Sequence, residues 1–284
     1  MIITHLMGGL GNQMFQYAAG RALALRFGAP CKLALAGFEA GGTLRKYMLH
    51  AFPIATTKAM PEDFAHMAPF ADKIFQNCTQ GIIAEPSYNY WPGFTSLVPP
   101  VYLAGYWQQE DYFLDAAESI RKDFTFPALP CPEANDLAAA IRSCATSVCI
   151  HIRRGDYAAD PTVRHVHGLC SLEYYAQALG ILARKVRDQL SLFLFTDDPA
   201  WVRRNFDAQG HPATIVDFPE HHDQPWHDMH LMSLGVHHII ANSSFSWWGA
   251  WLSSGKGMVI APKFWFALPA RRNDSPVPVR WIKV

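Results

Sequence analysis

The segment HIRRGDY, which begins at His151, gathers the side chains with the strongest potential for chemistry. It overlaps an apolar run that predicts a buried strand over 147–152. Arg153 and Arg154 can hold phosphate oxygens bidentately and keep their charge at physiological pH. His151 and Asp156 could each accept a proton from a substrate hydroxyl. The spacing predicts an anion site with a base beside it, and the alternative is a structural ion pair between an arginine and Asp156.

A second polar cluster lies between a predicted strand over 238–241 and a predicted helix over 245–253. Its members are Asn242, Ser243, Ser244, Phe245 and Ser246. One Asn or Ser is enough to cap a helix. The same geometry binds phosphate, because free backbone N–H groups and the positive end of the helix dipole converge there. The number of polar residues favours a ligand loop over a simple cap.

Asp197 and Asp198 follow a third predicted strand, over 190–195. Adjacent carboxylates can hold Mg²⁺ together with a nucleotide diphosphate. The alternatives are a helix cap, because Pro199 suits a first helical turn, and a hydrogen-bond acceptor for a nucleoside. The histidines within 221–238 form no HExxH motif and no cysteine joins them, which favours loop and core histidines over a metal site.

The glycine-rich segment 8–11 follows a predicted strand over 2–6 and precedes a predicted helix that begins at Asn12. It is similar to a dinucleotide-binding turn, but it lacks the third glycine and an acidic residue after the next predicted strand, 31–35. A tight strand-to-helix turn explains the glycines. Asn12 and Gln13 are predicted to reach into a cleft between two domains.

Short apolar runs alternate with helical patterns along the chain, which is typical of an α/β fold with parallel sheets. Predicted strands cover 2–6, 31–35, 101–105, 147–152, 190–195, 213–218, 238–241 and 258–261, and predicted helices cover 12–25, 111–122, 172–187, 229–237 and 245–253. Three prolines within 126–132 predict a linker. We therefore expect a first domain over 1–130 and a second over 131–284. Ligands bind at the carboxyl ends of parallel strands, where the polar clusters fall.

The amino-acid composition argues against several classes of protein. The 284 residues carry 24 Lys and Arg against 24 Asp and Glu, and 50% are hydrophobic. A disordered chain would be poorer in apolar residues, and nucleic-acid or membrane-surface binding usually brings a basic excess. No apolar stretch reaches the ~18 residues of a membrane span, and the N-terminus lacks a signal-peptide pattern. The six cysteines are too scattered for a disulfide framework or a zinc site. We expect a cytoplasmic protein, free or peripheral at the inner face of the membrane, with no nucleic-acid partner and an open oligomeric state.

Four segments resemble the bacterial α-1,2-fucosyltransferases of glycosyltransferase family 11. They are GGLGNQMFQYA from Gly8, GYWQQEDYF from Gly105, HIRRGDY from His151 and NSSFSWWGAWL from Asn242. The resemblance runs from the first residues to about residue 262. It implies a GT-B fold, in which two Rossmann-like domains face each other across a cleft. The N-terminal domain would form the acceptor side and the C-terminal domain would bind GDP-fucose, with a return of the last residues to the first domain left open.

The resemblance also implies an inverting transfer of L-fucose from GDP-β-L-fucose to the 2-hydroxyl of a terminal galactose in a glycan. The implied catalytic residues are His151, Arg153, Arg154 and Asp156, with the choice of base open between His151 and Asp156. The implied donor contacts are Asn12, Gln13, Asp197, Asp198, Asn242, Ser243, Ser244, Phe245 and Ser246. The implied acceptor contacts are Trp107 and Gln108. No metal and no cofactor are implied, since GDP-fucose is the donor substrate.

Several alternatives stay open. Residues 109–111 read Gln-Glu-Asp where the family segment reads Ser-Glu-Lys, which leaves the acceptor glycan open. The linkage could instead be α-1,6 or protein O-linked, or the chain could bind a sugar nucleotide or glycan without turnover. A NAD-dependent epimerase is a further alternative, against which the incomplete glycine pattern argues.

Overall fold

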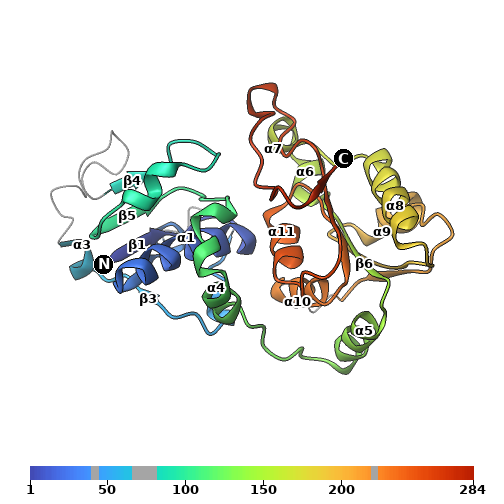
Figure 1. Cartoon of the computed structure of the whole chain (residues 1–284), viewed down its shortest axis with the longest axis horizontal. Coiled ribbons are helices and arrows are strands. Elements are labelled where there is room, and N and C mark those ends of the chain that lie inside the picture. Colours follow the sequence, from blue (N-terminus) through green and yellow to red (C-terminus); the bar gives the residue numbers. More distant parts are fainter. Residues whose placement is uncertain (40–44, 66–81, 219–222) are drawn as a thin grey trace. The chain divides into compact units, whose positions relative to one another are not determined.

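The computed structural model describes residues 1–39, 45–65, 82–218 and 223–284. The chain divides into two compact units, Met1–Pro127 and Ala128–Val284 (Figure 1). The division falls inside the proline-rich segment 126–132, where prolines remove backbone donors and disfavour both helix and central strand.

The first unit contains a parallel sheet with the strand order β3-β2-β1-β5-β4. Its strands are β1 (Ile2–His5), β2 (Cys31–Ala34), β3 (Thr57–Lys58), β4 (Ile82–Ala84) and β5 (Val101–Ala104). Its helices are α1 (Leu10–Phe27), α2 (Ala36–Glu39), α3 (Pro61–Ala65) and α4 (Ala117–Asp123), with 3₁₀ turns at Leu49–Ala51, Pro92–Ser96, Glu110–Tyr112 and Leu114–Ala116.

Close packing of α1 on β1 fixes the start of this helix at the carboxyl end of the central strand. A Cβ atom at Gly20 would lie 1.9 Å from Oγ1 of Thr4, so only glycine permits this approach. Tyr17 Oη donates to Oδ2 of Asp123 at 2.5 Å, and Arg21 Nε donates to the same oxygen at 2.9 Å. These contacts tie α1 to α4 as well as to the sheet.

The second unit contains a parallel sheet with the strand order β11-β10-β9-β6-β7-β8. Its strands are β6 (Ser147–Ile152), β7 (Ser191–Thr196), β8 (Ala213–Val216), β9 (His237–Ile239), β10 (Val259–Ala261) and β11 (Ile282–Lys283). Its helices are α5 (Pro132–Ser143), α6 (Gly155–Ala159), α7 (Pro161–His167), α8 (Leu172–Val186), α9 (Pro199–Asn205), α10 (Trp226–Ser233) and α11 (Ser244–Trp251), with a 3₁₀ turn at Pro269–Arg271. The last strand pairs with β10, so residues 282–283 belong to the second sheet.

Helices cover both faces of the second sheet, and the alternation of β6 shows why. Val148, Ile150 and Ile152 pack with α8 and α9 in one hydrophobic cluster. Cys149, between them, packs with α5 and α10 in another. All six residues of β6 are buried, as expected for a parallel strand covered on both sides. This packing on both faces holds β6 in place. Arg153 and Arg154 directly follow its carboxyl end, so they lie at one edge of the sheet.

The eight predicted strands are confirmed, with ends shifted by at most two residues. The predicted helix over 111–122 is wrong in its first half, which forms two 3₁₀ turns before α4. Tyr112 and Phe113 are fully buried there, so aromatic packing overrides the helical spacing. The predicted helix over 229–237 lies earlier, at α10. It ends before Gly235, whose Cβ would lie 2.5 Å from Sγ of Cys149, and the chain then enters β9.

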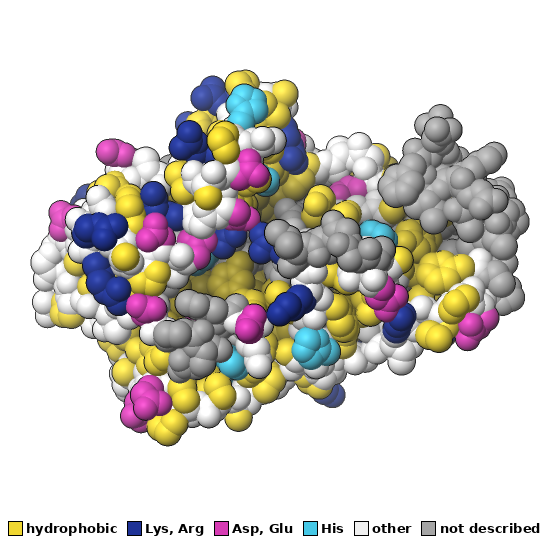
Figure 2. All heavy atoms as spheres, turned by 180° about the vertical axis from the view of Figure 1, so that it is seen from behind, with side chains coloured by type: hydrophobic (Ala, Val, Ile, Leu, Met, Phe, Trp, Pro, Cys, Tyr) yellow, Lys and Arg dark blue, Asp and Glu magenta, His cyan; other side chains and the backbone are white. Residues whose placement is uncertain are grey.

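Charges of both signs are interspersed on the face drawn in Figure 2, in keeping with equal numbers of acidic and basic residues. The described part of the chain contains no helix long and apolar enough to cross a membrane. Cys31, Cys131, Cys144, Cys149 and Cys170 are free thiols, and Cys78 lies outside the described residues.

Candidate active site

Three neighbouring strand ends carry the polar clusters of the second unit. Strands β9, β6 and β7 are adjacent and parallel, so their carboxyl ends lie at one edge of the sheet. Residues 153–156 follow β6, residues 197–198 follow β7, and residues 242–246 span the end of the loop after β9 and the first turn of α11. The structure thus brings the three clusters to one edge, an arrangement that the strand order alone creates.

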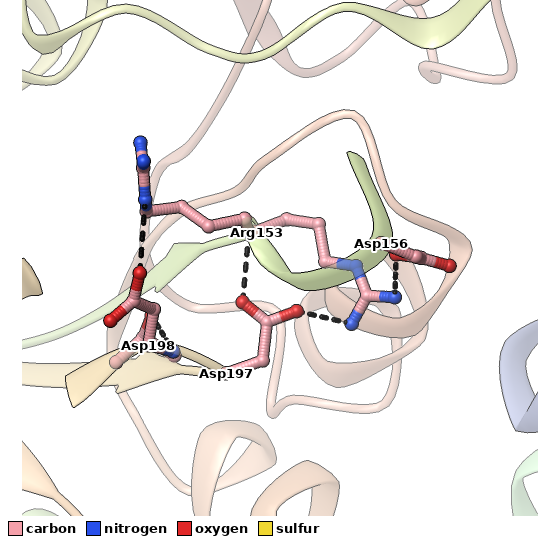
Figure 3. A network of polar contacts seen from close by, with 6 residues as sticks. Arg153, Asp156, Asp197 and Asp198 are labelled. Carbon is pink, nitrogen blue, oxygen red and sulfur yellow. Dashed lines mark hydrogen bonds and ion pairs between the residues drawn. The ribbon is translucent and has the colours of Figure 1, made fainter. Parts of the chain in front are cut away.

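Arg153 is held between two carboxylates. Its Nη2 lies 2.5 Å from Oδ1 of Asp156 and its Nη1 lies 2.6 Å from Oδ2 of Asp197. Figure 3 shows these carboxylates reaching the guanidinium from two sides. The ion pair with Asp156 that the sequence offered as an alternative is present. Because Asp197 also participates, the guanidinium position depends on two adjacent strands.

Gly155 makes room for Asp197. The backbone N–H of Arg154 donates to Oδ1 of Asp197 at 2.8 Å. A Cβ atom at Gly155 would lie 2.5 Å from Oδ2 of Asp197, which is the oxygen that Arg153 contacts. A side chain at position 155 would therefore displace the carboxylate that fixes both arginines.

Arg154 is held differently. Its guanidinium carbon lies 3.7 Å from the ring centroid of Trp201, on α9, and its Nε lies 3.4 Å from Oδ2 of Asp198. Asp198 also caps α9, since its Oδ1 accepts the Trp201 N–H at 3.0 Å. The cap predicted from Pro199 is therefore present, and the same aspartate contacts Arg154.

The formal charge of this cluster is −1, from two arginines and three aspartates. An anion that binds here competes with carboxylates for the guanidinium groups. Within residues 1–39, 45–65, 82–218 and 223–284, Nη1 and Nη2 of Arg154 contact no acceptor, so this edge of the guanidinium can receive a ligand. Backbone N–H groups in the first turn of α11 add donors at the same edge of the sheet.

His151 is buried, with 5% of its surface exposed, and its ring lies 5.5 Å from that of Phe245. Burial, reinforced by the charge of Arg153, lowers its pKa to about 3. The imidazole is therefore neutral at pH 7. Its backbone carbonyl accepts a hydrogen bond from Tyr175 Oη at 3.0 Å, which anchors the end of β6 to α8.

Residues 242–246, at the start of α11, include side chains used by the fold and side chains nearer the surface. Asn242 Nδ2 donates to the carbonyl oxygens of His167 and Trp265, at 2.7 and 3.2 Å. The Ser246 hydroxyl is buried and donates within the turn. Ser243, Ser244 and Phe245 are only partly buried. Their positions suit ligand contact better than those of Asn242 and Ser246.

In the first unit, Asn12 and Gln108 meet at the adjacent carboxyl ends of β1 and β5. Gln108 Nε2 donates to Oδ1 of Asn12 at 2.7 Å, and Tyr88 Oη donates to Oε1 of Gln108 at 2.6 Å. Gln13 is fully buried and its amide serves the backbone: Nε2 donates to the carbonyls of residues 8 and 46, and Oε1 accepts the N–H of residue 48. Gln13 thus fixes the loop near α1.

Trp107 is fully buried among aromatic rings, with Tyr112 at 5.2 Å and Phe94 at 5.4 Å between centroids. Its φ of 54° is unusual for a residue other than glycine. Glu85 stabilises this turn, since its carboxylate accepts the N–H groups of Tyr106 at 2.7 Å and Trp107 at 3.0 Å. Tyr106 is 41% exposed, so the aromatic surface of this turn comes from Tyr106.

Sequence reasoning missed Glu85, Gly155 and Trp201. A lone glutamate before Pro86 carries no pattern that assigns it to a turn that begins twenty-one residues later. Gly155 lies inside the HIRRGDY segment, but its role depends on the neighbouring strand. Trp201 lies three residues after the capping Asp198. This spacing could have predicted the hydrogen bond of its backbone N–H, but not the position of its ring.

No group of three or more His, Cys, Asp and Glu side chains is placed to hold a metal ion in the described ranges of the chain. His238 is buried and its Nε2 lies 2.9 Å from the carbonyl oxygen of Met232, in agreement with the interpretation as a core histidine. His221 and His222 lie outside the described residues.

Comparison with known proteins relates the whole chain to one protein family. The model of the family described as glycosyl transferase family 11 matches residues 1–284. The chain is 35% identical over 292 aligned positions to an alpha-1,2-colitosyltransferase of Escherichia coli, which covers all of this chain and 99% of that relative. It is 28% identical to galactoside 2-alpha-L-fucosyltransferase SEC1 of Bos taurus, over 93% of this chain and 67% of that relative.

The fold is similar to that of a variant of Arabidopsis thaliana FUT1 in complex with GDP, with a TM-score of 0.51, 12% identity, and coverage of 91% of this chain and 69% of that one. At this identity the likeness concerns the fold alone. Together with the two parallel sheets, it confirms the predicted α/β fold of GT-B type.

Proposed function

Since the chain belongs to glycosyltransferase family 11, we propose that it is an inverting fucosyltransferase. It moves L-fucose from GDP-β-L-fucose to the 2-hydroxyl of a terminal galactose in an oligosaccharide or glycan. The observation that carries this proposal is the pair of arginines at the end of β6, beside the first turn of α11, in a chain that matches the family throughout. The galactoside fucosyltransferase among the relatives supports the sugar and the acceptor class.

The arginines suit the chemistry of the leaving group. Cleavage of the bond between fucose and phosphate builds positive charge on the sugar ring and negative charge on GDP. Arg154 presents its Nη edge where that negative charge develops, and the amides of α11 add partial positive charge. Arg153 contributes from a position fixed by Asp156 and Asp197.

The acceptor hydroxyl must lose a proton as it attacks the fucose ring from the face opposite GDP. Asp156 is the better base of the two candidates. Its side chain is 36% exposed and can meet an acceptor hydroxyl, whereas His151 is buried. His151 then serves to shape the donor site beside Phe245.

The remaining residues fall into two groups. Asp197, Asp198, Ser243, Ser244 and Phe245 lie at the edge that receives GDP, with Asn242 and Ser246 shaping the loop. In the first unit, Asn12 is the proposed donor contact and Gln108 the proposed acceptor contact, and a hydrogen bond joins their side chains. Trp107 acts by filling the core under the turn, and Tyr106 replaces it as the aromatic side chain offered to the acceptor.

A second donor is favoured by one observation, the relative named for the transfer of colitose. Colitose is L-fucose without the 3-hydroxyl, so GDP-colitose offers the same diphosphate to the arginines. A site that hydrogen-bonds a substrate hydroxyl rejects the analogue lacking it by about 10⁴-fold. A site without that contact accepts both donors at similar rates.

The test is GDP release by the purified chain with lactose as acceptor and GDP-fucose or GDP-colitose as donor. We expect release that depends on lactose, and a product whose NMR spectrum shows an α-1,2 linkage. GDP-mannose, followed by release of GDP, and UDP-galactose, followed by release of UDP, serve as control donors. Binding of GDP-fucose without release would indicate a protein that binds without turnover, and release only with the control donors would refute the proposal. An α-1,6-linked product would correct the linkage.

A further inference from the structure

Trp201 contacts Arg154, whose Nη1 and Nη2 meet no acceptor among the described residues. The Arg154 guanidinium carbon lies 3.7 Å from the centroid of the Trp201 ring, close enough for a strong cation–π contact. Asp198 binds the backbone N–H of Trp201 at 3.0 Å and lies 3.4 Å from Nε of Arg154. The ring and the guanidinium are therefore positioned by the same aspartate.

These contacts leave a particular part of Arg154 available. The ring covers one face of the guanidinium, and Asp198 occupies its Nε side. Nη1 and Nη2, which meet no acceptor in the part of the chain that the structure describes, form the edge that can bind two phosphate oxygens at once. An arginine without such support would lose side-chain freedom when it binds the ligand.

We propose that Trp201 is a positioning residue, which orients the guanidinium of Arg154 so that its Nη edge binds the diphosphate of the donor. This inference rests on the proposed function, because it requires a nucleoside diphosphate at the end of β6. Trp201 itself need not touch the donor. It acts through Arg154.

The experiment is a double-mutant cycle read by the Kd for GDP, measured by calorimetry on the full chain. The variants are Trp201→Leu, Arg154→Ala and the pair together. A cation–π contact of this kind is worth about a two- to fivefold change in affinity. We expect Trp201→Leu to raise the Kd for GDP by that factor in the native background and to have no further effect beside Arg154→Ala.

Two further variants separate orientation from packing. Trp201→Phe keeps an aromatic face and should restore most of the affinity. Phe206→Leu removes an aromatic ring from the C-terminal end of the same helix, within the same hydrophobic cluster, and should leave the Kd unchanged. Trp201→Met provides a second side chain without an aromatic face if the leucine variant does not fold, as judged by thermal melting.

The outcomes are distinct. An equal loss of affinity on replacing Trp201 with or without Arg154, or the same loss in Phe206→Leu, would show that Trp201 only packs α9 and would overturn the inference alone. A failure of the unmodified chain to bind GDP would overturn the proposed function and this inference together.

Discussion

Replacing Gly155 with alanine perturbs the arginines through a single contact. The new Cβ would lie 2.5 Å from Oδ2 of Asp197, whereas ordinary contacts of this kind begin near 3.4 Å. The carboxylate must therefore move by about 0.9 Å, the difference between these two distances. That movement disturbs its 2.6 Å contact with Arg153 and its 2.8 Å hydrogen bond from the Arg154 N–H.

Two free-energy changes of opposite sign partly cancel in the stability of this variant. Weakening hydrogen bonds to a charged group costs about 1.5–3 kcal/mol, and the lower end applies because the side chains of Asp197 and Arg153 are 26% and 24% exposed. Alanine in place of glycine restores about 0.4–1 kcal/mol by restricting the unfolded chain. We expect a net loss of about 1 kcal/mol in the free energy of unfolding.

The effect on activity should be larger, because a shift of about 1 Å in a positioning group can cost on the order of a hundredfold in rate. We expect kcat/KM for GDP-fucose to fall by about ten- to a hundredfold. Gly180→Ala, within α8, is the matched control: its Cβ would lie 3.4 Å from the mobile end of Arg184, so it should keep full activity. If Gly155→Ala retained kcat/KM within about twofold, Asp197 would not set the arginine positions and the reasoning would fail.

Four further results are expected. Arg154→Lys should keep the fold but lose about a hundredfold in kcat/KM, because lysine lacks the bidentate edge; an unchanged rate would make Arg154 structural. Gln13→Ala should lower the free energy of unfolding by about 2–4 kcal/mol through its lost backbone contacts, whereas Asn12→Ala should lower kcat/KM with little change in melting temperature; the reverse pattern would exchange their roles. Burial lowers the pKa of His151 to about 3 and of His238 to about 4, so the unfolded chain takes up protons first as the pH falls. Stability should be complete above pH ~6.5 and decline toward pH ~4 by up to about 1.4 kcal/mol per pH unit for each histidine, with a smaller slope in His238→Gln; urea unfolding that is constant from pH 7 to 4.5 would contradict this. Activity should survive exhaustive EDTA treatment, because arginines and helix amides stabilise the leaving diphosphate, and rescue of a chelated enzyme by Mg²⁺ or Mn²⁺ would show otherwise.

Most strands of the two sheets could be predicted from the sequence, because buried parallel strands appear as continuous apolar runs. The run over 147–152 coincides with β6, and the polar residues after β6, β7 and β9 fall at strand ends as the pattern indicates. Strands β3 and β11 hold two residues each, which is too short for any period to appear. Their existence depends on the neighbouring strands that pair with them.

The contacts within the site could not be predicted, because they depend on strand order. Asp197 meets Arg153 only because β7 lies beside β6, forty-four residues apart in the chain. Tyr106, and not the predicted Trp107, is the exposed aromatic residue of its turn for a similar reason. Glu85 holds the backbone in a turn with positive φ at Trp107, which is buried while Tyr106 is exposed, and no periodicity in the segment encodes that turn.

The two arginines show that orientation and charge can be controlled separately. Carboxylates fix Arg153, but each one also cancels positive charge that a departing diphosphate would need. An aromatic face attracts a guanidinium through its quadrupole and adds no negative charge of its own. Among the described residues, Arg154 is stacked on Trp201 and has one carboxylate contact, 3.4 Å from Nε, so it is oriented while most of its charge stays available. In a cluster with a formal charge of −1, this makes Arg154 the residue whose electrostatic contribution to leaving-group stabilisation should be largest.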